Sequence, residues 1–134
     1  MPERTQTVTI EGYDAVKLHV IAYGALLQLG WTVKYAGNNI LVAYIHKTWK
    51  GYDNEITIQT ADGQLSVTSK MAQGTASDPA ETEKDVTDFM NAFDAVKKKA
   101  TDEDLREWNQ QVSAIEEETV KLAEQEIKQS TEVD

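Results

Sequence analysis

The fold is decided by residues 55–69, which read EITIQTADGQLSVTS. Polar and apolar side chains alternate on both sides of Asp62-Gly63, a pattern that is typical of strands with one covered face. Asp-Gly is a strong signal for a tight hairpin turn, because glycine accepts a positive φ at no steric cost. The sequence therefore predicts an antiparallel hairpin with strands at residues 55–60 and 65–69.

Two further strands precede this hairpin. Residues 31–35 alternate and place Trp31, Val33 and Tyr35 on one face. Residues 40–45 are apolar almost throughout, which predicts a central strand with both faces covered. The Gly-Asn-Asn sequence between the two segments is typical of a turn.

Residues 5–10 are rich in β-branched types and predict a short strand near the start of the chain. Residues 47–54 predict a loop between the apolar strand and the hairpin. This loop carries Trp49 and Tyr52, and aromatic side chains on a loop are candidate contacts for a protein partner. The alternative is that Trp49 folds back and packs under the sheet.

A helix is predicted over residues 13–29, with Asp14 in its first turn and Gly30 as a left-handed C-terminal cap. One face carries apolar residues at helical spacing: Ala15, Leu18, Ala22, Ala25, Leu26 and Leu29.

This helix also carries a second apolar stripe, and a helix that is apolar on two sides is usually buried on two sides. Either further elements of the chain cover this stripe, or it forms a groove for a protein partner. Its members, which are candidate contact residues, are Val16, Val20, Tyr23 and Leu27.

Two helices follow the hairpin. Asp78-Pro79 is a good helix start, and Thr101 with Asp104 forms a capping box that opens a further helix. In that last helix the apolar side chains are spaced like a heptad seam, at Leu105, Trp108, Val112, Ile115 and Leu122.

The seam ends in polar residues, since Thr119, Glu126 and Gln129 occupy its remaining positions. One interpretation is that this helix packs on its own domain near its start and then runs into solvent. The other is self-association of two chains, for which the candidate residues are Trp108, Val112, Ile115 and Leu122.

The order of elements is therefore β-α-β-β-β-β-α-α. We predict an α+β fold, in which an antiparallel β-meander of four to five strands has a helix after its first strand and two C-terminal helices. Residues 1–100 form an α+β accessory domain, and residues 101–134 form an acidic helix that serves as a spacer or packs on the domain.

The sequence lacks the residues that several kinds of functional site require. The 134 residues contain no cysteine, and the two histidines, His19 and His46, have no ligand partner at helical or strand spacing. The seven glycines are scattered, so no phosphate-binding loop is present. We expect no metal, no cofactor and no catalytic residues, and hence no enzymatic activity.

The net charge of −10 is concentrated in one region. Residues 1–100 hold 12 acidic and 10 basic side chains, whereas residues 101–134 hold 11 acidic and 3 basic ones. Such a chain repels nucleic acid and anionic lipid.

No leader peptide is evident in the polar start of the chain. The longest apolar stretch, residues 16–29, is interrupted by Lys17, His19 and Gln28, so we expect no direct membrane insertion.

Several short motifs resemble a known family. They are ALLQLGWTVKY at residues 25–35, ILVAY at residues 40–44, Trp49, and EITIQTADG at residues 55–63. Over residues 5–105 the chain is similar to a small soluble domain that precedes the membrane region of some bacterial rhomboid-type intramembrane proteases. It departs from that family in the polar loop at residues 73–77, where a Trp-Gly and a basic-Asn segment are expected.

The resemblance implies an accessory domain on the cytoplasmic side, tethered to a membrane protein, and it does not imply protease activity for this chain. The leading hypothesis is therefore a non-catalytic accessory or binding domain with a protein partner or a neighbouring membrane domain. One alternative is a free-standing protein that self-associates through residues 105–122, although a homodimer is less favoured. Another is a binder of small ligands with a cavity between helix and sheet.

Overall fold

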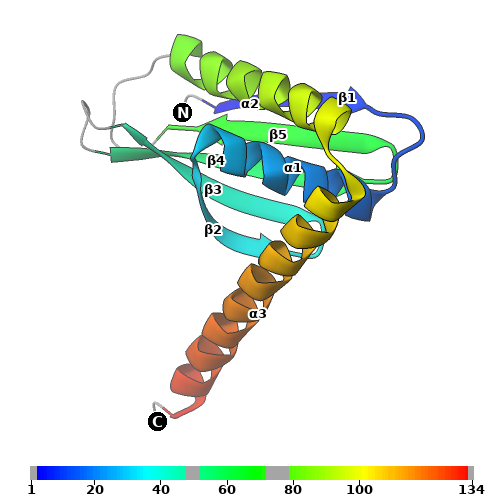
Figure 1. The fold of residues 1–134 in the computed structure, drawn as a ribbon. Helices are drawn as coiled ribbons and strands as arrows, with labels where there is room; N and C mark the ends of the chain where they lie inside the picture. Colours follow the sequence, from blue (N-terminus) through cyan, green and yellow to red (C-terminus); the bar gives the residue numbers. More distant parts are fainter. Residues whose placement is uncertain (1–2, 48–51, 72–78, 133–134) are drawn as a thin grey trace.

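The computed structural model describes residues 3–47, 52–71 and 79–132. These residues form a five-stranded sheet and three helices in the predicted order, which confirms the α+β fold (Figure 1). The elements are β1 (Glu3–Thr9), α1 (Ala15–Leu29), β2 (Thr32–Gly37), β3 (Ile40–Lys47), β4 (Tyr52–Ala61), β5 (Gln64–Lys70), α2 (Pro79–Lys99) and α3 (Asp102–Glu132).

The strands lie in the order β1-β5-β4-β3-β2, and every neighbouring pair is antiparallel. Strands β2 to β5 form the predicted meander, and β1 pairs with β5 at the far edge. Helices α1 and α2 lie side by side across one face of the sheet, while α3 runs past the β2 edge and projects from the body (Figure 1).

The core lies between this face and the two helices. Inward-facing residues of the strands alternate with more exposed ones, because successive side chains of a strand point to opposite faces. On the helix side, Phe89 and Phe93 of α2 have ring centroids 6.0 Å apart. Other fully buried members of the core are Leu18, Leu26, Leu41, Ile56, Ile58, Leu65 and Val67.

Two aspartates that are far apart in the sequence accept backbone hydrogen bonds from the start of helix α1. Asp14 Oδ1 accepts the N–H of Lys17 at 2.8 Å, and Asp62 Oδ1 of the hairpin turn accepts the N–H of Ala15 at the same distance. We had expected Asp14 in the first turn of the helix, but it is the N-terminal cap. Gly30 ends the helix with φ 74°, as predicted.

Strand β2 differs from its prediction because it contains a β-bulge. Val33 pairs with Ala43 and Tyr35 with Val42, so the register shifts between them. One extra residue in a strand moves the following side chains to the other face. Val33 and Tyr35 consequently lie on opposite faces, and Tyr35 is exposed.

The outer face of the sheet also corrects the prediction that both faces of residues 40–45 are covered. Leu41, Ala43 and Ile45 are buried, whereas Val42 and Tyr44 on the other face are only half-buried. Towards β1 this outer face is polar, with a hydrogen bond of 2.8 Å between the hydroxyls of Thr7 and Ser66. The helices therefore cover only one face of residues 40–45. The apolar side chains on the other face are partly covered by neighbouring side chains of the sheet.

The connection between β3 and β4 is shorter than the predicted loop at residues 47–54. Strand β3 extends to Lys47, and β4 begins at Tyr52, whose backbone pairs with that of Lys47. The segment between the two strands, including Trp49, lies outside the described residues.

Candidate interaction site on helix α3

Helix α3 begins with a reciprocal cap, which confirms the predicted capping box. The Thr101 hydroxyl accepts the N–H of Asp104 at 3.1 Å, and Asp104 Oδ2 accepts the N–H of Thr101 at 3.1 Å. The two bonds satisfy backbone donors that the start of a helix leaves unpaired. The cap lies directly after α2, so the chain reverses and α3 returns across α1.

The first half of α3 approaches α1 most closely at a glycine. A Cβ atom added to Gly24 would lie 2.7 Å from two ring carbons of Trp108, closer than real atoms pack. Glycine inside a helix costs about 1 kcal/mol relative to alanine. Here the indole of Trp108 occupies the space that a side chain at position 24 would fill. Packing therefore explains why this helix has a glycine at this position.

Two polar contacts accompany this packing. The Tyr23 hydroxyl donates to Gln111 Oε1 at 3.0 Å, and burial raises the pKa of Tyr23. Further along α3, the Thr119 hydroxyl accepts the backbone N–H of Ala36 at 3.3 Å. Because β2 is an edge strand, this bond covers a donor that would otherwise be open to another chain.

His19 of α1 lies beside Glu116 of α3. Nε2 of His19 is 3.5 Å from Glu116 Oε1, and the imidazole is almost fully buried. Desolvation lowers the pKa of His19, while the charge of Glu116 acts in the opposite direction. Desolvation is the larger of the two effects, so the pKa of His19 lies below its ordinary value.

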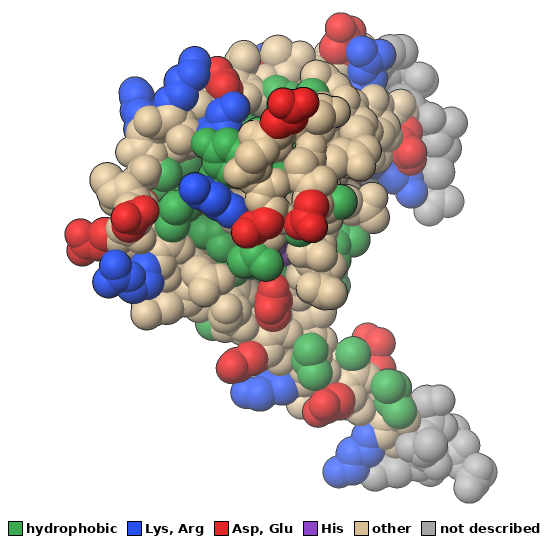
Figure 2. Space-filling model, turned by 90° about the vertical axis from the view of Figure 1, so that its right-hand side faces the viewer, with side chains coloured by type: hydrophobic (Ala, Val, Ile, Leu, Met, Phe, Trp, Pro, Cys, Tyr) green, Lys and Arg blue, Asp and Glu red, His purple; other side chains and the backbone are tan. Residues whose placement is uncertain are grey.

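Beyond Thr119, helix α3 leaves the body and its apolar side chains are exposed. Val120, Leu122 and Ile127 expose 54%, 45% and 67% of their surface. Figure 2 shows hydrophobic side chains along the projecting part, with acidic and basic side chains between them. A shallow depression of about 480 Å³ surrounds Val120 and is lined by Ser113, Glu116, Glu117, Val120, Lys121 and Glu124.

The structure separates the four candidate contact residues of α1. Val20 and Tyr23, in the middle of the stripe, are buried, and the Tyr23 hydroxyl contacts Gln111 of α3, so they offer no free surface in this conformation. Val16 and Leu27, at its two ends, are exposed. Of the two interpretations of this stripe, cover by further elements of the chain holds at its centre, and an open groove for a partner does not.

The four candidate self-association residues are likewise divided. Val112 is buried, and Trp108 and Ile115 are partly buried against the core, so these three side chains pack within one chain. Only Leu122 lies on the projecting half. The candidate contact Trp49 lies outside the described residues, as does the side chain of Tyr52.

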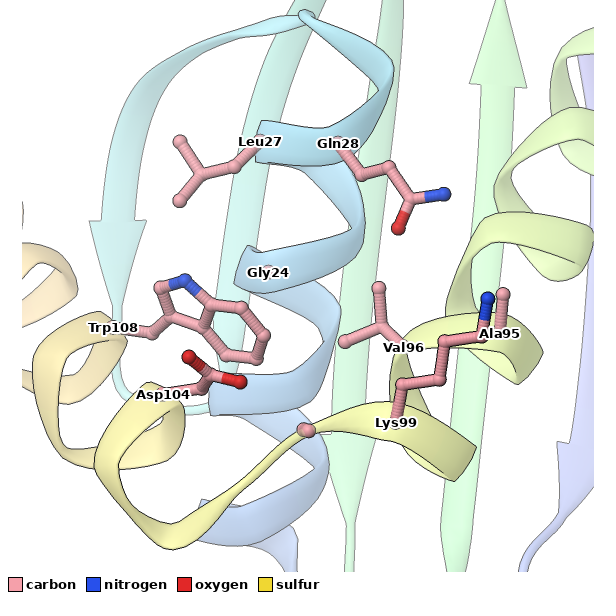
Figure 3. Close-up of a pocket in the computed structure, with 9 residues that line it drawn as sticks. Gly24, Leu27, Gln28, Ala95, Val96, Lys99, Asp104 and Trp108 are labelled. Carbon is pink, nitrogen blue, oxygen red and sulfur yellow. The ribbon is translucent and has the colours of Figure 1, made fainter.

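A pocket of about 400 Å³ lies where the three helices meet (Figure 3). The end of α2 forms one wall, the start of α3 another, and α1 the back. The pocket is mainly apolar and has three polar side chains, from Gln28, Lys99 and Asp104. Its position among helices differs from the cavity between helix and sheet that we had considered.

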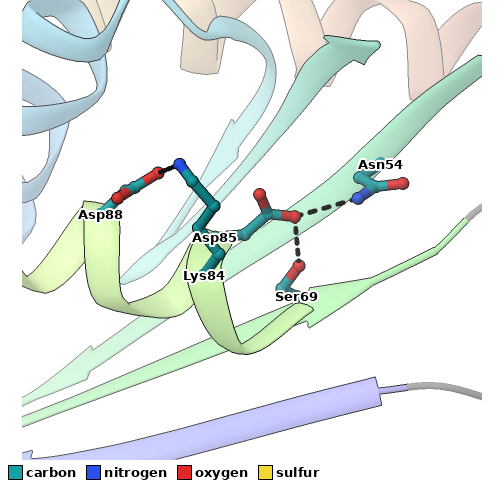
Figure 4. Close-up of polar contacts among 5 residues, drawn as sticks. All are labelled: Asn54, Ser69, Lys84, Asp85 and Asp88. Atoms are coloured by element: carbon teal, nitrogen blue, oxygen red, sulfur yellow. Dashed lines mark hydrogen bonds and ion pairs between the residues drawn. The ribbon is translucent and has the colours of Figure 1, made fainter. Parts of the chain in front are cut away.

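Sequence reasoning missed a buried polar cluster under the start of α2 (Figure 4). Asp85 is 1% exposed, and its Oδ2 accepts bonds from Asn54 Nδ2 and the Ser69 hydroxyl, each at 3.0 Å. The same Asn54 amide donates to Glu81 Oε1 at 3.1 Å. The sequence could have indicated that Asp85 is buried, because Asp85 is next to Val86 and four residues before Phe89, on the apolar face of its helix. The cluster joins α2 to the start of β4 and to the end of β5.

Within the described ranges, no group of three or more acidic or histidine side chains is arranged to hold a metal ion. The same ranges include no helix with the length and apolar character that crossing a membrane requires. Of the two histidines, His19 is buried under α3 and His46 is exposed on β3.

No protein-family model matches this chain, and no curated protein sequence matches it. The resemblance to the soluble domain of rhomboid-type proteases therefore stays a prediction.

Proposed function

We propose that this chain is a non-catalytic accessory module that binds a protein partner through the projecting half of α3. The observation that carries the proposal is the exposure of Val120 and Ile127 on a helix whose first half is packed. Single exposed apolar residues are common, but Val120 and Ile127 lie seven residues apart and so share one face of the helix, which is typical of a contact surface.

The shape of the surface favours a helical partner. Val120, Ala123 and Ile127 follow one another at intervals of three and four residues, so they lie on one stripe of α3. An amphipathic helix binds such a stripe by laying its own apolar face along it.

Charge determines which helix fits. Residues 116–128 hold five acidic and two basic side chains, and Glu116, Glu117 and Glu124 surround Val120. A second copy of this segment would bring like charges together, whereas a helix rich in lysine and arginine would be complementary. The proposed partner is therefore a basic amphipathic helix.

This choice agrees with an accessory role beside a membrane protein. Cytoplasmic segments next to membrane spans carry an excess of lysine and arginine. An acidic helix would be attracted to such a segment and repelled by the anionic lipid around it. We therefore place the module on the cytoplasmic side, tethered through the basic partner.

The test is a titration of the purified chain with a synthetic basic amphipathic helix, and with an acidic helix of the same apolar pattern. We expect binding of the basic peptide that weakens with added salt, and at least tenfold weaker binding of the acidic one. The double variant Val120→Ser and Ile127→Ser should lose the binding. Val16→Ser is the matched control, because Val16 is an equally exposed apolar residue on α1.

Two outcomes would contradict the proposal. One is equal affinity for both peptides, or equal binding by the double variant and the control. The other is a dimer of the chain alone in analytical ultracentrifugation that the double variant abolishes, which would assign the same surface to self-association.

A further inference from the structure

The pocket at the junction of the three helices has the character of a small-molecule site. Its volume of about 400 Å³ lies within the range that ligand pockets occupy, roughly 300–1,000 Å³. Leu27, Val96 and Trp108 supply apolar surface, and the side chains in Figure 3 surround a common space. This site is separate from the projecting half of α3.

The pocket carries one charge of each sign on different walls. Lys99 belongs to the end of α2, and Asp104 lies beside Trp108 at the start of α3 (Figure 3). The neighbouring Lys98 and Lys97 are paired with Asp94 at 3.1 and 3.8 Å. No acidic partner is seen for Lys99 within the described part of the chain, so its ammonium group is available to an anion.

Asp104 supplies the acidic side chain of the pocket. Its Oδ2 accepts the N–H of Thr101, and a carboxylate accepts more than one hydrogen bond. An ammonium group near Asp104 would also lie near the indole of Trp108, whose ring attracts cations. The two sides of the pocket are thus suited to opposite ends of a dipolar molecule.

We propose that this pocket binds a small zwitterion with an apolar group, in the manner of a free hydrophobic amino acid. Lys99 receives its carboxylate, Asp104 its ammonium group, and the surface of Leu27, Val96 and Trp108 its apolar part. The proposal does not depend on the partner helix proposed above, because it concerns different residues and a different class of ligand.

The experiment uses nuclear magnetic resonance of the whole chain, with the indole N–H signal of Trp108 as the reporter. Trp108→Phe identifies that signal among the three tryptophans. L-phenylalanine is compared with phenethylamine, which lacks the carboxylate, and with 3-phenylpropionate, which lacks the ammonium group. Each compound is titrated into the native chain, Lys99→Gln, Asp104→Asn and the control Lys98→Gln.

We expect L-phenylalanine to shift the Trp108 signal in the millimolar range and to bind more tightly than either analogue. Exposed ion pairs are individually weak, so Lys99→Gln and Asp104→Asn should each reduce its affinity by roughly two- to fivefold. The pattern should cross: Lys99→Gln leaves phenethylamine unchanged, and Asp104→Asn leaves 3-phenylpropionate unchanged. Lys98→Gln should change none of the three.

Each contrary result is decisive. Absence of any shift with L-phenylalanine up to tens of millimolar would overturn the proposal, and so would equal binding of all three compounds. Asparagine at position 104 can still accept the capping bond, and unchanged melting temperatures would show that both variants are folded. If Lys98→Gln weakens the binding as much as Lys99→Gln does, the ligand is attracted by the general positive charge at the end of α2 and not by Lys99 in the pocket.

Discussion

The two halves of α3 belong to one continuous helix but differ in what surrounds them. In the first half, Val112 is 1% exposed and Trp108 lies against Gly24. In the second half, apolar residues of similar size, Val120 and Ile127, are 54% and 67% exposed. The helix itself does not change at Thr119; the body of the protein ends there, at the β2 edge.

This difference shows that helix formation and helix packing have separate causes. The projecting half has favourable spacings for an isolated helix, since Glu117 precedes Lys121 and Glu124 precedes Lys128 by four residues. Such pairs contribute only about 0.2–0.5 kcal/mol each. Its helical state is therefore supported mainly by continuation from the packed half, and Val120 and Ile127 stay exposed to solvent.

The sharpest test of the comparison places the same charge in each half. Val112→Asp would bury an unpaired carboxylate, which should lower the free energy of unfolding by about 3 kcal/mol or more. Val120→Asp should change it by about 0.5 kcal/mol or less, because that side chain is exposed. Urea denaturation of both variants measures the two values, and similar losses would show that the second half is also packed.

A smaller effect is expected at the contact between α1 and α3. Gly24→Ala should destabilise the chain by about 1–2 kcal/mol, because the added Cβ displaces the indole of Trp108. In a Trp108→Ala background the sign should reverse, with a gain of up to about 1 kcal/mol from the higher helix propensity of alanine. A double-mutant cycle measures this coupling. If Gly24→Ala has the same effect in both backgrounds, the close contact does not constrain position 24.

The smallest effect concerns pH. Burial holds the pKa of His19 below its ordinary value of 6.5, so the unfolded chain takes up a proton at a higher pH than the folded one. The contribution of His19 to stability is unaffected well above pH 6.5 and should decrease as the pH falls through that value towards the lower folded pKa.

Thermal denaturation at a series of pH values checks this prediction. His19→Gln should reduce the loss of stability between neutral and mildly acidic pH. His46→Gln is the control, because His46 is exposed on β3. If the two substitutions have the same effect, the burial of His19 does not link the stability of the fold to pH.

Local patterns were sufficient for the features that depend on neighbouring residues. Alternation around Asp62-Gly63 predicted the hairpin, and the reciprocal positions of Thr101 and Asp104 predicted the start of α3. Gly30 was recognised as a cap because a left-handed residue ends many helices. These features need only a few consecutive residues, so their physics is contained in short stretches of sequence.

The candidate site was predicted less completely. The seam of α3 and the second stripe of α1 were both recognised, and cover of the stripe by further elements was one interpretation, but nothing in the sequence identified α3 as the element that packs against Tyr23. The bulge that turns Tyr35 outward also escaped prediction, because it depends on pairing with β3. Gly24 could have indicated a close contact, since a glycine inside a helix often lies where another side chain approaches the backbone. Nothing in the sequence identifies that side chain as Trp108.

By itself, the sequence determined the α+β class, the order of the elements, the C-terminal cap of α1, the N-terminal cap of α3 and the acidic character of the last helix. These follow from side-chain periods of two and 3.6 residues and from turn and cap chemistry, which act over a few residues. Only the tertiary structure decided that the first half of α3 fills the second face of α1 and that Asp85 is buried with Asn54 and Ser69. It also decided that Val120, Leu122 and Ile127 remain exposed, because burial depends on which surfaces the folded chain brings together.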